Sequence, residues 1–149
     1  MYEPLIRVAA RNAVPQPAPI NPSWILSGTP RAHSVPVAAS DDRAVSAWIW
    51  ECTAGRFIWR YDCDETIHVL DGAVTISSQG EEERHLVSGD TIHFSRGAVA
   101  IWTVDAHIRK IAFCRSAPPR PLALLMRIAR HVRRRVSAWL RIPAAALPT

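Results

Sequence analysis

Between Ala44 and Cys114 the sequence consists of short segments in which apolar and polar residues alternate, separated by clusters of turn residues. A period of two places successive side chains on opposite faces of a strand, and no helical period or internal repeat interrupts it. We predict strands at Val45–Cys52, Arg56–Tyr61, Thr66–Leu70, Ala73–Ser77, Glu82–Val87, Thr91–Phe94, Ala100–Val104 and Arg109–Arg115. Short strands at this spacing predict an all-β sandwich or barrel.

Residues 55–72 place an acidic side chain among apolar ones. Asp62 to Asp64 supply a turn between two predicted strands, and Asp71-Gly72 is a strong two-residue hairpin signal. The positions that share one face in each strand are Phe57, Trp59 and Tyr61, then Glu65, Ile67 and Val69. The carboxylate of Glu65 is therefore expected beside a hydrophobic wall.

The chain divides into parts of different composition. We predict a Pro-rich arm at 1–22, a β-domain at 23–116 and a basic helical tail at 117–149. Within the domain, Ser23–Leu26 could join a sheet edge through Trp24. His33–Ala39 reads as an edge strand that Pro36 interrupts.

Two motifs resemble those of the cupins. Glu65 is followed after six residues by Gly72, which matches the end of the first cupin motif. Gly89-Asp90 followed by Ser95-Arg96-Gly97 looks like the second, with Ser95 where proline is usual. Segments 23–26, 50–55, 64–68 and 109–113 are similar to the branch grouped with ureidoglycine aminohydrolase. The resemblance covers about residues 20–115 and implies a cupin double-stranded β-helix, a jelly-roll barrel.

The resemblance also implies where a metal would be held. Metal-binding cupins present two His, a Glu and a third His inside the barrel, and these positions fall on Trp59, Tyr61, Glu65 and Ala100. Only the carboxylate is a ligand, so we expect no transition metal and no cofactor. His68 should face away from Glu65 by strand alternation, and His93 has no partner that spacing identifies.

The interior positions remain a candidate binding site. Trp59, Tyr61, Glu65 and Trp102 would form a pocket with aromatic walls, one hydroxyl and one carboxylate, or they would simply fill the barrel. Lys110, the only lysine, could pair with Glu65 or with Glu51. The cysteines at 52, 63 and 114 have no spacing that suggests a nucleophile with its base.

The positive charge of the chain is concentrated at its C-terminal end. Residues 115–149 contain eight arginines and no acidic residue, which gives +8, whereas residues 1–114 carry −3. Apolar residues at three- and four-residue steps predict an amphipathic helix over 121–142. Its apolar stripe could dock on the β-domain or on a second subunit, or the helix could contact an anionic membrane surface. We expect no nucleic acid partner.

Two functional hypotheses follow. In the first, the chain is a cytoplasmic cupin that binds a small polar metabolite through Trp59, Tyr61, Glu65, Trp102 and Lys110, with enzymatic activity left open. In the second, it is a non-enzymatic homodimeric interaction module whose basic amphipathic tail docks to a partner or to an anionic membrane surface. The odd number of cysteines, the absence of an apolar run of 18 residues and the lack of a signal-peptide pattern favour the cytoplasm.

Overall fold

The computed structural model describes residues 13–116 of the chain, which form an all-β domain. The strands are β1 (Gln16–Pro17), β2 (Ile25–Gly28), β3 (Ala32–Ala39), β4 (Val45–Arg60), β5 (Asp64–Ser77), β6 (Arg84–Val87), β7 (Thr91–Phe94) and β8 (Val99–Arg115). A short 3-10 helix, η1, spans Pro22–Trp24. Within 13–116 no helix has the length and apolar character needed to cross a membrane. The helix predicted over 121–142 lies outside the described residues.

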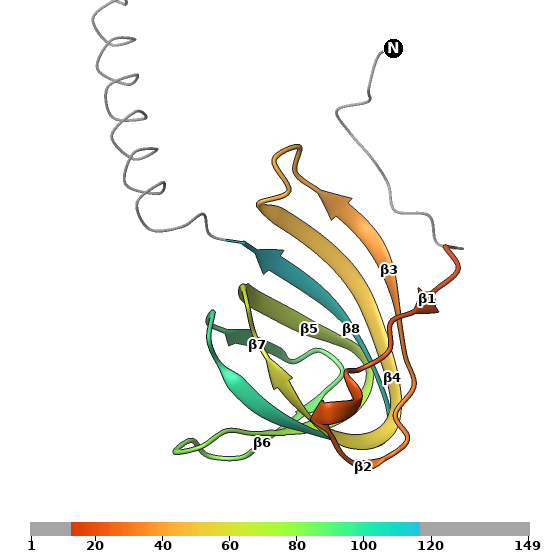
Figure 1. Ribbon diagram of the computed structural model, residues 1–149, viewed down its shortest axis with the longest axis vertical. Coiled ribbons are helices and arrows are strands. Elements are labelled where there is room, and N and C mark those ends of the chain that lie inside the picture. Colours follow the sequence, from red (N-terminus) through yellow and green to blue (C-terminus); the bar gives the residue numbers. More distant parts are fainter. Residues whose placement is uncertain (1–12, 117–149) are drawn as a thin grey trace, which may run out of the picture. The chain divides into compact units, whose positions relative to one another are not determined.

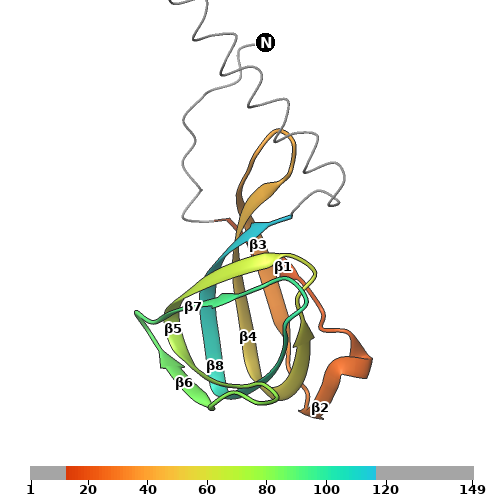
Figure 2. The same ribbon diagram turned by 90° about the vertical axis from the view of Figure 1, so that its left-hand side faces the viewer.

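Three long strands give the domain its two-sheet architecture. The first halves of β4 and β5 and the second half of β8 form one sheet in the order β1-β3-β4-β8-β5-β7. The remaining halves form a second sheet in the order β2-β4-β8-β5-β6. All neighbours are antiparallel. Figure 1 shows these long strands curving from one layer into the other, and Figure 2 shows the strands curling around a common interior. This is the jelly-roll arrangement expected of a cupin.

The long strands bend at β-bulges. The pairing of β5 with β8 shifts register around Asp71 and Gly72, and that of β4 with β8 shifts between Thr53 and Gly55. The hairpin predicted at Asp71-Gly72 is therefore wrong, because β5 continues through it. Gly72 has a φ of +78°, the left-handed conformation that a bulge often requires. The Asp71-Gly72 pair, which is also favoured in hairpin turns, thus bends β5 without reversing the direction of the chain.

Each bulge also changes which residues face inward. On β5 the buried positions are odd before the bulge, ending at Val69, and even after it, beginning at Val74. The largest side chains almost fully excluded from solvent are Trp102, Phe57, Ile67, Ile108, Val69 and Val74. They come from β4, β5 and β8, so the core lies between the two sheets.

Several predicted boundaries differ from those observed. Three pairs of predicted strands are merged into β4, β5 and β8, since a bulge does not end a strand. The turn residues Ser88-Gly89-Asp90 also favour a hairpin, but β6 and β7, which they join, both pair with β5 and not with each other. Trp24 belongs to η1, and the edge strand begins at Ile25. The strand predicted at His33–Ala39 is β3, which shifts register between Pro36 and Ala38, but β1 pairs with its first part at His33 and Ser34, so only the later part of β3 is an edge.

Candidate functional site

A buried ion pair joins β5 and β8. The Nζ atom of Lys110 donates a hydrogen bond to Oε1 of Glu65 over 2.6 Å, and the two residues are only 5% and 7% exposed. Burying a charge without a partner is very costly, so each of these groups requires the other. Of the two partners predicted for Lys110, the structure selects Glu65. Glu51 instead lies 4.0 Å from Nε of Arg109 in a largely exposed pair.

Aromatic rings surround this ion pair. The Nζ atom of Lys110 lies 5.3 Å from the ring centroid of Trp50 and 5.2 Å from that of Trp102. A cation at this distance from a ring face is attracted by the ring quadrupole, more strongly when water is excluded. Trp50 also meets Trp59 edge to face at 5.8 Å, and Trp59 meets Trp24 in the same way. The ammonium group therefore has a fixed position in a mostly apolar frame.

A cavity of about 350 Å³ opens beside the ion pair. It is lined by Ala18, Pro19, Ser34, Trp48, Trp50, Trp59, Glu65, Lys110, Ala112 and Cys114. Most of its lining side chains are apolar, and among residues 13–116 the charged ones in its wall are Glu65 and Lys110. Apolar walls with a few converging polar groups are typical of a small-molecule site.

The structure separates the five predicted site residues into two groups. Trp59, Glu65 and Lys110 line the cavity, whereas Tyr61 and Trp102 belong to the packed core. Nε1 of Trp102 donates a hydrogen bond to the Tyr61 hydroxyl over 3.1 Å, and the Tyr61 ring stacks on Phe94 at 4.2 Å. Burial, and secondarily the Glu65 charge, raises the pKa of Tyr61, which keeps the phenol protonated. The interior is thus filled around Trp102 and open around Lys110.

The side chains at the cupin metal positions do not fit a histidine-bound ion. Trp59, Tyr61 and Ala100 offer an indole, a protonated phenol and a methyl group near the carboxylate of Glu65. His68 hydrogen-bonds Thr91, and His93 hydrogen-bonds Thr66. These four residues alternate with the buried positions of their strands, so both histidines lie on the opposite face of the sheet from Glu65, as predicted for His68.

Two thiols, whose spacing in the sequence suggests no site, lie next to Glu65. The sulfur atoms of Cys63 and Cys114 and a carboxylate oxygen of Glu65 all lie within 4.8 Å of one another. Burial raises the pKa of Cys114 to about 12, and burial and the neighbouring Asp62 charge raise that of Cys63. Spacing could not reveal this group, because Cys114 reaches Glu65 only through the pairing of β5 with β8.

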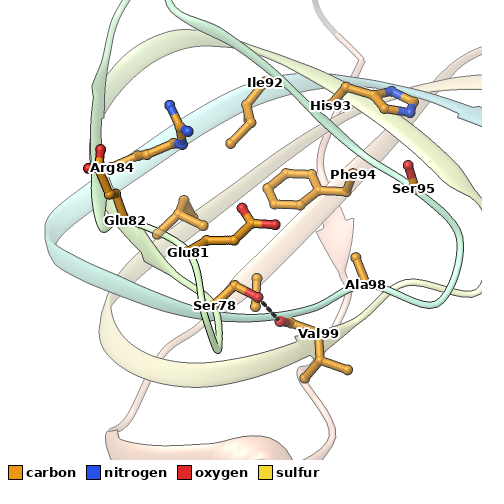
Figure 3. A pocket seen from close by; sticks show the side chains of 12 residues that line it. Ser78, Glu81, Glu82, Arg84, Ile92, His93, Phe94, Ser95, Ala98 and Val99 are labelled. Carbon is orange, nitrogen blue, oxygen red and sulfur yellow. Dashed lines mark hydrogen bonds between the residues drawn. The ribbon is translucent and has the colours of Figure 1, made fainter.

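Smaller cavities lie elsewhere on the domain. One, of about 180 Å³, is bordered by the β5–β6 hairpin and the loop after β7, where Ser78 Oγ donates to the Val99 carbonyl (Figure 3). Its charged residues, Glu81, Glu82 and Arg84, are exposed. Another, of about 290 Å³, contains an exposed contact between His107 and Asp71. Among the residues that the structure describes, neither of these two cavities contains a buried charged group, in contrast to the cavity at Lys110.

Comparison with known proteins identifies the type of domain. The family model of the EutQ-like cupin domain matches residues 39–112. A protein of unknown function from Pseudomonas syringae pv. tomato has a similar structure, with a TM-score of 0.64 and 22% identity over 71% of this chain and 46% of that one. The EutQ protein of Clostridium difficile gives 0.53 and 19% over 68% and 83%, and KdgF from Halomonas gives 0.52 and 14% over 69% and 89%. These likenesses establish the fold. No curated protein matches the sequence.

Proposed function

Because this chain carries a cupin domain, we propose that it binds a small polar metabolite in the cavity beside Lys110 and Glu65. The buried ion pair is the observation that carries the proposal. A lysine in the interior of a β-domain is costly, and apolar residues of similar size would pack there without that cost. A role in recognising a ligand accounts for its presence.

The hydrogen-bonding capacity of the pair indicates the ligand chemistry. An ammonium group has three N–H donors, and among residues 13–116 that of Lys110 hydrogen-bonds Glu65. The remaining donors suit an acceptor oxygen of a ligand, such as a carbonyl or a carboxylate. Trp48 and Trp59 offer aromatic surface to its apolar part. The binding of a compact molecule with one polar end is therefore what the cavity supports.

A ligand screen tests this proposal on the intact protein. Small carbonyl- and carboxylate-containing metabolites are tested for thermal stabilisation, and those that stabilise are titrated by calorimetry. A ligand at about 100 times its Kd raises the free energy of unfolding by about 2.7 kcal/mol. We expect Glu65→Gln to abolish this stabilisation, because the substitution removes the charge that positions Lys110.

Tyr61→Phe provides a matched control. It removes a buried hydroxyl that accepts from Trp102 but does not line the cavity, so ligand-induced stabilisation should persist. A ligand response that Glu65→Gln leaves intact, or the failure of every such metabolite to stabilise the protein, would contradict the proposal.

The remaining sequence-based predictions stay outside this proposal. The narrower resemblance to ureidoglycine aminohydrolase, the homodimer, the cytoplasmic location and a membrane contact through 121–142 remain predictions. The residues around the cavity support binding, and no enzymatic reaction is proposed for them.

A further inference from the structure

The Cys63, Glu65 and Cys114 group is assembled by tertiary structure. Cys63 lies in the bend that precedes β5, Glu65 is the second residue of β5, and Cys114 is the cross-strand partner of Glu65 on β8. Glu65 is buried, whereas both cysteines are half-buried and are free thiols. Three donor atoms from two separate segments therefore meet at one point near the surface.

The donor types and spacing fit a tetrahedral metal ion. Thiolates select soft or borderline ions, and Zn²⁺ bound at about 2.3 Å from each of two sulfurs would hold them about 3.8 Å apart. The donors now lie within 4.8 Å, so small side-chain rotations suffice. We propose that Cys63, Glu65 and Cys114 bind one zinc ion and leave its fourth position open to the cavity, which Glu65 and Cys114 line.

The surrounding charges favour this occupancy. Lys110 already balances the charge of Glu65, and two thiolates would balance the charge of Zn²⁺, so these groups sum to zero, and the exposed carboxylate of Asp62 beside Cys63 adds a negative charge that favours a cation. Asp64 and Arg115, whose charged atoms lie 3.9 Å apart, largely offset each other nearby. A neutral buried site avoids most of the desolvation cost of an isolated ion. Zinc binding releases the two thiol protons to solvent.

This site differs from the histidine site of metal-binding cupins. It shares only Glu65 with the ligand positions of that arrangement, because Cys63 lies between the motif positions at Tyr61 and Glu65 and Cys114 lies beyond the second motif. The expectation of no transition metal followed from the missing histidines at the motif positions and from the placement of His68 and His93, whereas this site uses thiols. The zinc site also stands without the proposed metabolite, because all three ligands come from the protein.

Cobalt titration of the reduced, full-length protein tests the site directly. Co²⁺ commonly replaces Zn²⁺ in tetrahedral sites, and thiolate ligands produce a charge-transfer band in the near ultraviolet. We expect one equivalent of Co²⁺ to give this band and one equivalent of Zn²⁺ to remove it. Absence of the band, or a Cys63–Cys114 disulfide that resists reduction and excludes the metal, would overturn the proposal.

Serine substitutions assign the ligands. Cys63→Ser and Cys114→Ser should each weaken zinc binding by at least about 100-fold and reduce the band, because loss of a direct ligand costs no less than loss of an outer partner. Cys52→Ser is the matched control, since Cys52 is a buried thiol outside the cluster. Equal zinc affinity in the Cys63→Ser/Cys114→Ser double variant and the natural protein would refute the assignment.

Protection of the cysteines from alkylation can be measured on the natural protein, so this test does not depend on whether the variants fold. Saturating Zn²⁺ should slow alkylation of Cys63 and Cys114, read by mass spectrometry of peptides, by about tenfold or more. Unchanged alkylation of both cysteines at saturating zinc would count against the site. None of these measurements includes a metabolite, so failure of the zinc site and failure of metabolite binding give separate results.

Discussion

Removing the charge of Lys110 should strongly destabilise the domain. Lys110→Met leaves the carboxylate of Glu65 buried with no cation beside it, so we expect the free energy of unfolding to fall by about 3–5 kcal/mol. Urea unfolding followed by tryptophan fluorescence measures the change.

The double variant Glu65→Leu/Lys110→Met separates charge from packing. Replacing a buried ion pair by apolar groups of similar volume is often neutral, so this variant should unfold within about 1 kcal/mol of the natural protein. If Lys110→Met alone were neutral, the ion pair would have no role in stability.

Cys52 should make the domain sensitive to alkaline pH. Burial raises the pKa of this thiol from 9.0 to about 12. Between these values the unfolded chain releases a proton that the folded protein keeps, so the free energy of unfolding falls as pH rises. Cys52→Ala removes this contribution and should lose less stability between about pH 8 and pH 10.5 in urea unfolding.

The same comparison below about pH 8 provides the control. The thiol is protonated in both states there, so the difference between the natural protein and Cys52→Ala should not depend on pH. Parallel stability curves through the alkaline range would show that Cys52 ionises normally in the folded protein.

Individual site residues differed in how well sequence could predict them. Glu65 was found because the first motif fixes its position, and the pairing of Lys110 with Glu65 was one of two stated possibilities. The proximity of Cys63 and Cys114 to Glu65 was missed, because strand register, and not spacing along the chain, brings Cys114 to Glu65. Trp50 and Trp48 were missed as cavity walls, because their place depends on the path of β3 and the arm.

At the scale of elements, the bulge in β5 depends on Gly72. A Cβ atom added there would clash with the His107 carbonyl oxygen, in addition to the strain of a φ of +78°. We expect Gly72→Ala to reduce the free energy of unfolding by about 3 kcal/mol, measured by urea unfolding.

Gly80 offers a matched comparison for this substitution. Its φ of +80° is nearly the same, but nothing lies within 4 Å of an added Cβ atom. Gly80→Ala should therefore cost only about 1 kcal/mol, from backbone strain alone. Equal losses in the two variants would mean that close packing against His107 adds nothing.

The existence of the strands was predictable, and their continuity was not. Alternation located every long strand, since half-buried sheets leave that pattern in any sequence. Asp71-Gly72 satisfies the backbone requirements of both a hairpin and a bulge, and only the pairing of β5 with β8 decides between them. The two-residue strand β1 is too short to leave a periodic signal.

At the scale of the whole molecule, residues 121–149 should determine assembly. The predicted amphipathic helix carries most of the excess positive charge, and we expect it to support either a homodimer or binding to anionic vesicles. Deleting 121–149 should abolish whichever of these the full-length protein shows, as measured by light scattering and vesicle sedimentation.

Salt dependence distinguishes the two modes of assembly. Vesicle binding through arginines should weaken as salt is raised, whereas a dimer held by an apolar stripe should persist. A full-length protein that is monomeric and does not sediment with vesicles would remove both roles from the tail.

Ala18 and Pro19 line the cavity, yet they precede the span that the cupin family model matches. Ser34, on β3, also lies outside that span. Segments outside the matched span therefore supply part of the cavity wall, and substitutions there can change what the cavity admits while residues 39–112 stay the same. A fragment limited to residues 39–112 would lack Ala18, Pro19 and Ser34 from that wall.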